Sequence, residues 1–341
     1  MTQTHMAAEV AEIPVAARRL LEQGRAGIAA AAADMRARNP AFLATVARGS
    51  SDHAATFLKY AFELELGLPV ASIGPSVASV FGARMQMGNS GVVGISQSGK
   101  SPDIVAMLKA AQQGGARTLA ITNNADSPLA EVADHALPIM AGPELSVAAT
   151  KTFVTSALAG LALLAHWSED RALLDALDAL PDQLDAATRC DWGPLHDNLL
   201  DRRSMYVLGR GPSYAMACEA ALKFKETCGL HAEAYSSAEV LHGPVEIVDA
   251  AYPVLVLASR DAAENAALEV AETLATRGAA VFISSAGAKT AGRLPFVDTG
   301  HPLTDPLCLI TSFYAFIEKL ARARGRNPDT PANLRKVTET V

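Results

Sequence analysis

The 341-residue chain has few cysteines and no long uncharged apolar run. Its four cysteines have neither CxxC spacing nor the density of a secreted disulfide framework, so we expect reduced thiols that mostly pack in the interior. The N-terminus lacks a basic region followed by an apolar run, and no uncharged apolar stretch reaches the roughly 18 residues that a membrane span needs. These absences predict a soluble cytoplasmic protein with no membrane partner.

A surplus of basic residues is missing as well. Lysine and arginine number 29 against 36 aspartates and glutamates, which gives a net charge of −7. A chain of this charge has no general attraction to nucleic acid, so we expect no nucleic-acid partner and only local anion binding. Half of the residues are apolar, which is enough for one large or two ordinary domains and excludes a disordered chain.

Several ligand-binding signatures are also absent. The chain contains neither the GxxxxGK[ST] pattern of nucleotide-binding loops nor the GxGxxG pattern of dinucleotide-binding folds. The spacing of its histidines and cysteines matches no zinc signature. We therefore expect no cofactor and no metal.

From about residue 41 onward, short β-branched apolar runs alternate with longer alanine-rich stretches. This alternation is typical of βαβ units and a parallel sheet. The predicted strands form two series: Phe42–Val46, Val70–Ile73, Val92–Ile95, Thr118–Thr122 and Ala136–Ile139, and then Met205–Leu208, Val254–Leu257, Ala280–Ile283 and Phe296–Val297. We expect an α/β fold with two tandem domains, each a flavodoxin-like parallel sheet of about five strands flanked by helices. The expected boundaries are a helical arm over 1–34, a first domain over 35–175, a second over 195–325 and a tail over 326–341.

An internal repeat supports two similar domains. Arg48, Gly49, Ser51 and Ala55 recur as Arg210, Gly211, Ser213 and Ala217, in both cases between a predicted strand and a predicted helix. Glycine and serine are common in such turns, so four matches are weak evidence by themselves. Their equivalent placement in two similar domains indicates duplication.

Hydroxyl side chains are concentrated in the turn after the strand Val92–Ile95, which reads Ser96-Gln97-Ser98-Gly99-Lys100-Ser101. In a parallel sheet such a turn lies at the ligand-binding edge, and helix N–H groups with hydroxyls suit a phosphate monoester. The alternative is that these residues only form and cap the turn. A second hydroxyl pair, Ser50 and Ser51, follows the first strand and should open onto the same edge.

Charged residues also recur on one face of a predicted helix in the second domain. Glu219, Lys223 and Glu226 are spaced i, i+4 and i+7, a pattern that by itself favours a solvated face. Four more candidates follow within sixteen residues: His231, Glu233, Glu239 and His242. A carboxylate flanked by lysine and histidine is a proton-transfer arrangement, although the same cluster could bind a metal.

The ordered motifs along nearly the whole chain closely resemble the sugar isomerase (SIS) domain family, in particular the isomerase half of glucosamine-6-phosphate synthase. The motifs are Gly49-Ser50-Ser51, Ser96-Gln97-Ser98-Gly99, Ala141-Gly142-Pro143-Glu144 with Val147 to Lys151, Leu208-Gly209-Arg210-Gly211, Glu219 to Lys223 with Lys225-Glu226, His231 to Tyr235, Glu239, His242-Gly243-Pro244 and Asn333 to Thr338.

The resemblance implies a role for each matching residue. It assigns the sugar phosphate to Ser50, Ser51, Ser96, Gln97, Ser98, Ser101 and Val147. It also implies that Glu226 moves the proton between C1 and C2, that His242 opens the sugar ring and comes from the partner subunit of a homodimer, that Lys336 forms an imine, and that Lys223 packs beside the base.

Two departures from the family bear on the reaction. Only about forty residues precede the first predicted strand and no cysteine precedes Cys190, so we expect no glutaminase activity. Ala149 and Lys100 replace the usual serine and glutamate, which leaves the exact sugar open.

Without channelled ammonia the resemblance implies an amino-sugar phosphate deaminase that releases ammonia and fructose 6-phosphate, with glucosamine 6-phosphate as the first candidate substrate. A fructosamine-6-phosphate deglycase, another phosphosugar isomerase and a non-catalytic sugar-phosphate sensor are the alternatives.

Overall fold

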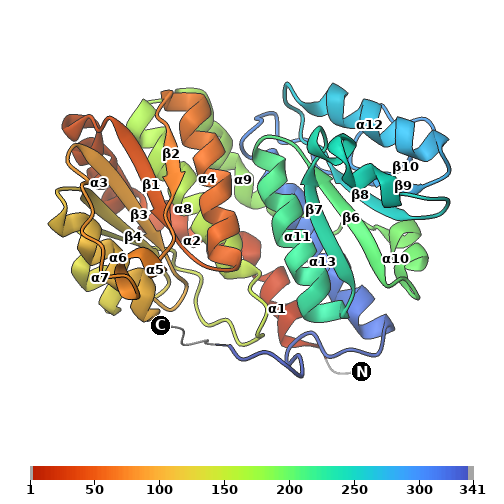
Figure 1. The fold of residues 1–341 in the computed structure, drawn as a ribbon, viewed down its shortest axis with the longest axis horizontal. Coiled ribbons are helices and arrows are strands. Elements are labelled where there is room, and N and C mark those ends of the chain that lie inside the picture. The colour runs from red at the N-terminus through yellow and green to blue at the C-terminus, as the bar shows by residue number, and fades with distance from the viewer. Residues whose placement is uncertain (1–2, 337–341) are drawn as a thin grey trace. The chain divides into compact units, whose positions relative to one another are not determined.

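The computed structural model describes residues 3–336, which form two compact units. The first unit contains Ile13–Glu144 and Lys151–Asp178. The second unit contains residues 3–12, Leu145–Thr150 and Ala179–Lys336. Each unit has its own five-stranded parallel sheet with helices, so the expected α/β architecture of two similar sheets is confirmed (Figure 1).

The sheet of the first unit has the strand order β2-β1-β3-β4-β5. Its strands are β1 (Phe42–Val46), β2 (Val70–Ser72), β3 (Ser90–Ile95), β4 (Arg117–Thr122) and β5 (His135–Pro138). Its helices are α2 (Ile13–Gln23), α3 (Arg25–Arg38), α4 (Ser50–Leu66), α5 (Ser76–Ser79), α6 (Pro102–Gln113), α7 (Pro128–Val132) and α8 (Lys151–Ser168). The central strand β3 is buried along its whole length because helices cover both faces of a parallel sheet.

Helix α8 is the most deeply buried helix described for this unit. All but two of its residues are buried, and it packs against α2, α3 and α4. A helix that is apolar on every side belongs in the interior rather than at the surface. No helix within residues 3–336 is long and apolar enough to cross a membrane.

The sheet of the second unit has the order β10-β9-β8-β6-β7. Its strands are β6 (Ser204–Gly209), β7 (His231–Ser236), β8 (Pro253–Leu257), β9 (Ala280–Ile283) and β10 (Gly292–Arg293). Its helices are α1 (His5–Ala11), α10 (Gly193–Leu199), α11 (Pro212–Cys228), the 3-10 turns η1 (Glu239–His242) and η2 (Pro244–Ile247), α12 (Glu264–Thr276) and α13 (Asp305–Ala323). Helix α9 (Arg171–Ala187) runs across the boundary between the units along the chain.

The two sheets have the same topology. When the strands of each unit are numbered from one to five along the chain, both orders read 2-1-3-4-5 in one direction, the flavodoxin-like order. The repeated glycines also adopt the same backbone conformation, with φ 56° and ψ −134° at Gly49 and φ 57° and ψ −136° at Gly211. In each unit this positive φ turns the chain from the first strand of the sheet into the next helix, which explains the repeat in the sequence.

Two strand expectations in the second unit are wrong. The expected strand Phe296–Val297 is irregular, and the last strand of the sheet is instead the short β10. Strand β7 was not expected, because its sequence HAEAYS is polar on alternate residues. That alternation is typical of an edge strand with one exposed face, and β7 lies at the edge of its sheet beside β6.

Candidate functional site

In the first unit, both hydroxyl-rich turns lie at the carboxyl edge of two neighbouring strands. Strand β1 pairs in parallel with β3, and Val46 lies opposite Gly94 near the ends of these strands. Ser50 and Ser51 are the first residues of α4, and Ser101 is the N-cap of α6. In a sheet of this order the carboxyl ends of these two strands form the switch point where ligands bind.

The turn after β3 is built on Gly99, whose φ is +64°. A Cβ atom at this position would lie 2.1 Å from the Ser127 hydroxyl oxygen, so only glycine fits. The Gly99 N–H donates to the Ser96 hydroxyl at 3.2 Å, and the Lys100 N–H donates to the Ser98 hydroxyl at 3.3 Å. The Ser101 side chain makes no capping hydrogen bond to α6. The turn therefore combines a constrained backbone with hydroxyls at a helix N-terminus, which suits an anion.

An ion pair connects the two turns. The Arg48 guanidinium, which follows β1, donates to the fully buried carboxylate of Asp103 in the first turn of α6. Arg48 is thereby occupied by a structural partner, and its half-exposed side chain fixes the two turns relative to each other. Burial raises the pKa of the nearby Asp52 carboxyl at the start of α4.

In the second unit, helix α11 carries a buried lysine between two carboxylates. The Lys223 Nζ atom lies 2.5 Å from Glu226 Oε2 and 3.1 Å from Glu219 Oε1. Glu219 and Lys223 are fully buried, whereas the Glu226 side chain is 21% exposed. The face that the spacing alone would place in solvent is therefore an internal ion cluster with one partly exposed carboxylate.

Tyr314 of α13 completes this cluster, with its hydroxyl donating to Glu219 Oε1 at 3.0 Å. Burial by itself would lower the pKa of Lys223, but the two carboxylates raise it overall and keep the ammonium charged. Nothing in the sequence marks Tyr314, because it lies among apolar residues of a buried helix. Glu226 is thus held at 2.5 Å from a permanent cation and has access to solvent.

None of the four polar candidates after α11 forms a hydrogen bond or ion pair with Glu226 within residues 3–336, where the recorded partner of Glu226 is Lys223. His231 and Glu233 lie on the edge strand β7 with exposed side chains. His242 ends η1 and is exposed, and its side chain makes no hydrogen bond or ion pair with any residue among 3–336. No group of three or more His, Cys, Asp or Glu side chains in the described chain could hold a metal ion.

The segment that carries Val147 also belongs to the second unit and lies beside the tail. The Val147 N–H donates to the Asp329 carbonyl at 2.9 Å. The Lys336 ammonium donates to the Ser146 carbonyl at 2.6 Å. The structure therefore brings Val147 and Lys336 together, although 189 positions separate them, since 336 − 147 = 189.

The turn after β8, which corresponds to the hydroxyl turn of the first unit, is filled by Arg260. Its guanidinium donates to the carbonyls of Ala258 and Ser284 and lies 4.0 Å from the ring centroid of Phe296. The backbone N–H of Arg260 donates to Asp305 at the start of α13. The guanidinium is therefore engaged by sheet-end carbonyls and an aromatic ring, and the turn lacks the hydroxyl cluster of its counterpart in the first unit.

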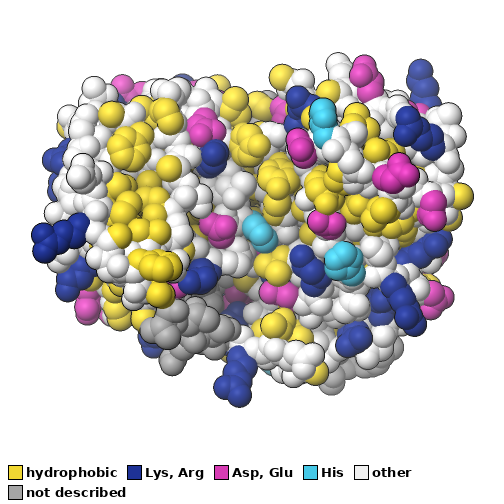
Figure 2. Space-filling model, in the orientation of Figure 1, with side chains coloured by type: hydrophobic (Ala, Val, Ile, Leu, Met, Phe, Trp, Pro, Cys, Tyr) yellow, Lys and Arg dark blue, Asp and Glu magenta, His cyan; other side chains and the backbone are white. Residues whose placement is uncertain are grey.

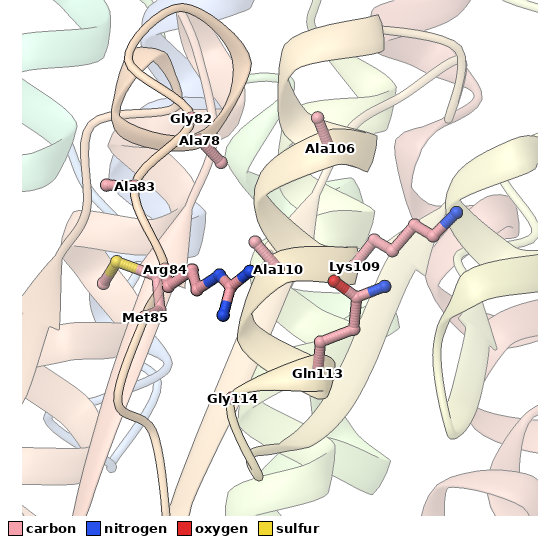
Figure 3. Close-up of a pocket in the computed structure, with 10 residues that line it drawn as sticks. All are labelled: Ala78, Gly82, Ala83, Arg84, Met85, Ala106, Lys109, Ala110, Gln113 and Gly114. Atoms are coloured by element: carbon pink, nitrogen blue, oxygen red, sulfur yellow. The ribbon is translucent and has the colours of Figure 1, made fainter.

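A surface cavity of about 570 Å³ in the first unit lies away from the hydroxyl turns. It is lined by residues of the loop after α5 and by the second half of α6, whereas the hydroxyl turn precedes the first residue of α6 (Figure 3). Hydrophobic side chains gather over α5 and the following loop on this face, where Val80 and Phe81 are largely exposed (Figure 2). This cavity is therefore distinct from the candidate site.

Known proteins resemble the chain along most of its length. The model of the family described as SIS domain matches residues 41–166 and 198–295. The glutamine–fructose-6-phosphate aminotransferases (isomerizing) of Symbiobacterium thermophilum and Halobacterium salinarum are each 35% identical, over 86% and 88% of this chain. The alignments cover 51% and 52% of those proteins, so the chain spans about half the length of these relatives.

Solved structures agree with this similarity. A putative phosphosugar isomerase from Silicibacter pomeroyi is 56% identical, with a TM-score of 0.93 over 96% of this chain and all of that chain. The C-terminal domain of the glucosamine-fructose-6-phosphate aminotransferase of Francisella tularensis is 25% identical, with a TM-score of 0.84 over 97% of this chain and 99% of that one. With both sheets and both sets of turns matched by one family model, the chain belongs to the SIS domain family.

Proposed function

We propose that this protein is a phosphosugar isomerase that acts on an amino sugar as a glucosamine-6-phosphate deaminase. The overall reaction converts glucosamine 6-phosphate and water to fructose 6-phosphate and ammonia. The observation that carries the proposal is the partly exposed Glu226 carboxylate held against the buried Lys223 ammonium, since a fixed carboxylate suits proton transfer next to a carbonyl. The names of the isomerizing aminotransferases at 35% identity include fructose 6-phosphate, the proposed product.

The hydroxyl turns of the first unit bind the phosphate group in this proposal. Ser96, Ser98 and Ser101, with Ser50 and Ser51, supply hydroxyls at the N-termini of α6 and α4, where backbone N–H groups and the helix dipole favour an anion. Gln97 contributes its side-chain amide. The corresponding turn of the second unit is occupied by Arg260, so one phosphate binds per chain.

Proton transfer is assigned to Glu226. After ring opening, the C1 aldehyde makes the C2 proton acidic, and the carboxylate removes it and returns it at C1. The Lys223 ammonium, 2.5 Å away, fixes the position of this carboxylate. The product of this step is an imine at C2, from which ammonia still has to be released.

Lys336 is assigned to the imine step. Its amine replaces ammonia at C2, and hydrolysis of the resulting lysine imine regenerates the free amine and yields fructose 6-phosphate. Val147 lies on the same segment as the carbonyl that holds Lys336, and we assign it to the sugar. Mass action favours the direction of release, because ammonia is dilute and no donor amide is consumed.

His242 is assigned to ring opening in the site of a second copy of this chain, in a homodimer. Its exposure, together with the exposure of Leu241 and Ile247 around it, supports a role outside its own unit. A mixture of Glu226→Gln and His242→Ala chains then contains mixed dimers with one intact site. Activity recovered on mixing supports the shared site, and no recovery after demonstrated subunit exchange contradicts it.

The central experiment measures ammonia release from a panel of 6-phosphorylated amino sugars and fructosamines, together with exchange of the substrate C2 proton in deuterated water. Wild-type protein should release ammonia from glucosamine 6-phosphate. Glu226→Gln should abolish C2 exchange with little change in binding, whereas Lys336→Ala should retain exchange and lose ammonia release.

The conservative control is Lys225→Gln, an exposed position on the same helix as Glu226, which should leave both rates unchanged. Ammonia release from fructosamine 6-phosphates alone would replace the deaminase assignment with the deglycase. Wild-type exchange by Glu226→Gln would mean that another residue is the base.

A further inference from the structure

Glu9 of α1 is a buried carboxylate that the proposed reaction does not use. Its side chain is 4% exposed, and it shares a helix face with the buried Met6 and Val10. Helix α1 packs on α13 through this face, for which apolar residues alone would suffice. A buried carboxylate is costly unless several donors satisfy it, so the donors of Glu9 indicate what it stabilises.

All the donors recorded for Glu9 lie on the segment that carries Val147. The Leu145 N–H and the Ser146 hydroxyl donate short hydrogen bonds to its two oxygens, and the Ser146 N–H donates at 3.2 Å. Hydrogen bonds to a charged acceptor are about twice as strong as neutral ones. Glu9 therefore fixes the backbone and the side chain of Ser146 together.

Ser146 links Glu9 to Lys336 in the tail through hydrogen bonds. Its N–H and hydroxyl are directed to Glu9, and its carbonyl accepts the hydrogen bond from the Lys336 ammonium at 2.6 Å. Ser146 is fully buried, and Glu9 fixes its N–H and side chain on one side of the carbonyl. On the other side, the peptide that carries the carbonyl is held by the Val147 N–H, which donates to the carbonyl of Asp329, a residue bonded to the start of α1. The orientation of the acceptor for Lys336 is thus set from α1.

Asp329 in the tail forms hydrogen bonds both with α1 and with the segment that carries Val147. The Asp329 carboxylate accepts from the N–H groups of His5 and Met6 at 2.9 and 2.8 Å, at the start of α1. The Asp329 carbonyl accepts from the Val147 N–H at 2.9 Å. Helix α1, the segment Leu145–Thr150 and the tail are therefore tied pairwise, all within the second unit.

We propose that Glu9 is the positioning residue for Lys336, acting through Ser146. Glu9 touches no substrate. It holds the Ser146 carbonyl in the orientation that places the lysine amine, and with it the Val147 backbone. The consequence for catalysis rests on the role of Lys336 in the proposed function, whereas the positioning itself does not.

The first experiment follows hydrogen exchange of the backbone amides in Leu145–Thr150 and the labelling rate of Lys336 by reductive methylation, both without substrate. Glu9→Ala should speed exchange at 145–147 and change the labelling rate, because three hydrogen bonds are lost. Glu9→Gln, which keeps an acceptor oxygen, should lie between this variant and the wild type. Glu22→Ala, an exposed carboxylate on α2, is the control and should match the wild type.

The second experiment separates positioning from general stability. Glu9→Ala should lower ammonia release by up to about 100-fold, the effect of a displaced catalytic group, while C2 proton exchange stays near the wild-type rate. Introduced into Lys336→Ala, Glu9→Ala should cause no further loss, because the residue it acts through is already gone.

Unchanged amide exchange and labelling in Glu9→Ala would overturn the proposal, as would additive losses in the double variant or an equal fall in C2 exchange and ammonia release. If Glu9→Ala does not fold, Glu9→Gln and Ser146→Ala carry the same comparisons. If the wild type releases no ammonia from any sugar, the proposed function fails, and the exchange and labelling results decide the positioning of Lys336 by themselves.

Discussion

Replacement of Lys223 by methionine tests whether the cluster on α11 is a buried charge network. The substitution keeps the length and the apolar part of the side chain but removes the ammonium from between Glu219 and Glu226. Glu219 is fully buried, and the variant removes the ammonium that lies 3.1 Å from its carboxylate in the interior. Removal of one partner of a buried ion pair costs about 3–5 kcal/mol of unfolding free energy. At roughly 2–4 °C per kcal/mol, the melting temperature of the variant should fall by about 6–20 °C.

The pH dependence makes the test specific. In the wild type the pKa of Lys223 is raised above 10.5, so its contribution to stability is complete below that value and is lost only as the pH rises through the raised pKa. In Lys223→Met, burial raises the pKa of Glu219, and a carboxyl with a raised folded-state pKa loses stability as the pH rises. The melting-temperature gap between wild type and variant should therefore be larger at pH 8 than at pH 5.

The assay is thermal unfolding followed by circular dichroism at both pH values. Lys225→Met removes the same charge from an exposed position on α11 and should change the melting temperature little. Adding Glu219→Gln to Lys223→Met should recover part of the loss, because the amide oxygen still accepts from Tyr314 without a charge. A Lys223→Met protein as stable as the wild type, or one with the same deficit at pH 5 and pH 8, would refute the reasoning.

Three further substitutions address the turns. Gly99→Ala should abolish phosphosugar binding, because its Cβ would collide with a neighbouring side chain. Gly49→Ala has open space but keeps a backbone conformation (φ 56°, ψ −134°) that favours glycine, so it should cost about 1–3 kcal/mol of backbone strain without a collision; isothermal titration and thermal unfolding distinguish the two. Ser98→Ala with Ser101→Ala should raise KM at least about tenfold, since each hydrogen bond to a charged acceptor contributes about 1.5–3 kcal/mol, and an unchanged KM would rule out the phosphate assignment. Arg260→Ala should lower thermal stability, because the guanidinium bonds to sheet-end carbonyls are lost, and equilibrium dialysis of the wild type should find one bound phosphosugar per chain; a second equivalent in the wild type would contradict the assignment of one site.

The sequence predicted those strands whose apolar residues are also buried in the sheet. Strand β3 is buried at every residue, and its sequence after Ser90 contains only glycine, valine and isoleucine. Strand β7 is an edge strand with exposed charges, and polar residues in that pattern look like a loop until the pairing with β6 is known. Phe296 and Val297 satisfy strand propensity, but the ring of Phe296 packs under the Arg260 guanidinium, a tertiary contact that no local rule supplies.

The candidate site, too, could be predicted from the sequence only in part. The hydroxyl turns were predictable, because Ser98 and Ser101 lie directly after a strong strand and before a helix. The spacing of Glu219 and Lys223 identifies a shared helix face but not whether that face is buried, and burial depends on α13. The bond between Lys336 and Ser146 joins positions far apart in the chain, so no pattern in either segment could reveal it.

The segment Leu145–Thr150 has a consequence for how the protein can be taken apart. It belongs to the second unit although the residues on both sides of it belong to the first, and α9 carries the chain across once more. No single cleavage therefore yields two complete units, and a truncation after α9 would strip the second unit of α1 and of this segment. A gene split there produces fragments that must recombine rather than autonomous modules. A separately expressed second unit has to be built as a rearranged chain in which α1 and the segment are grafted back by linkers.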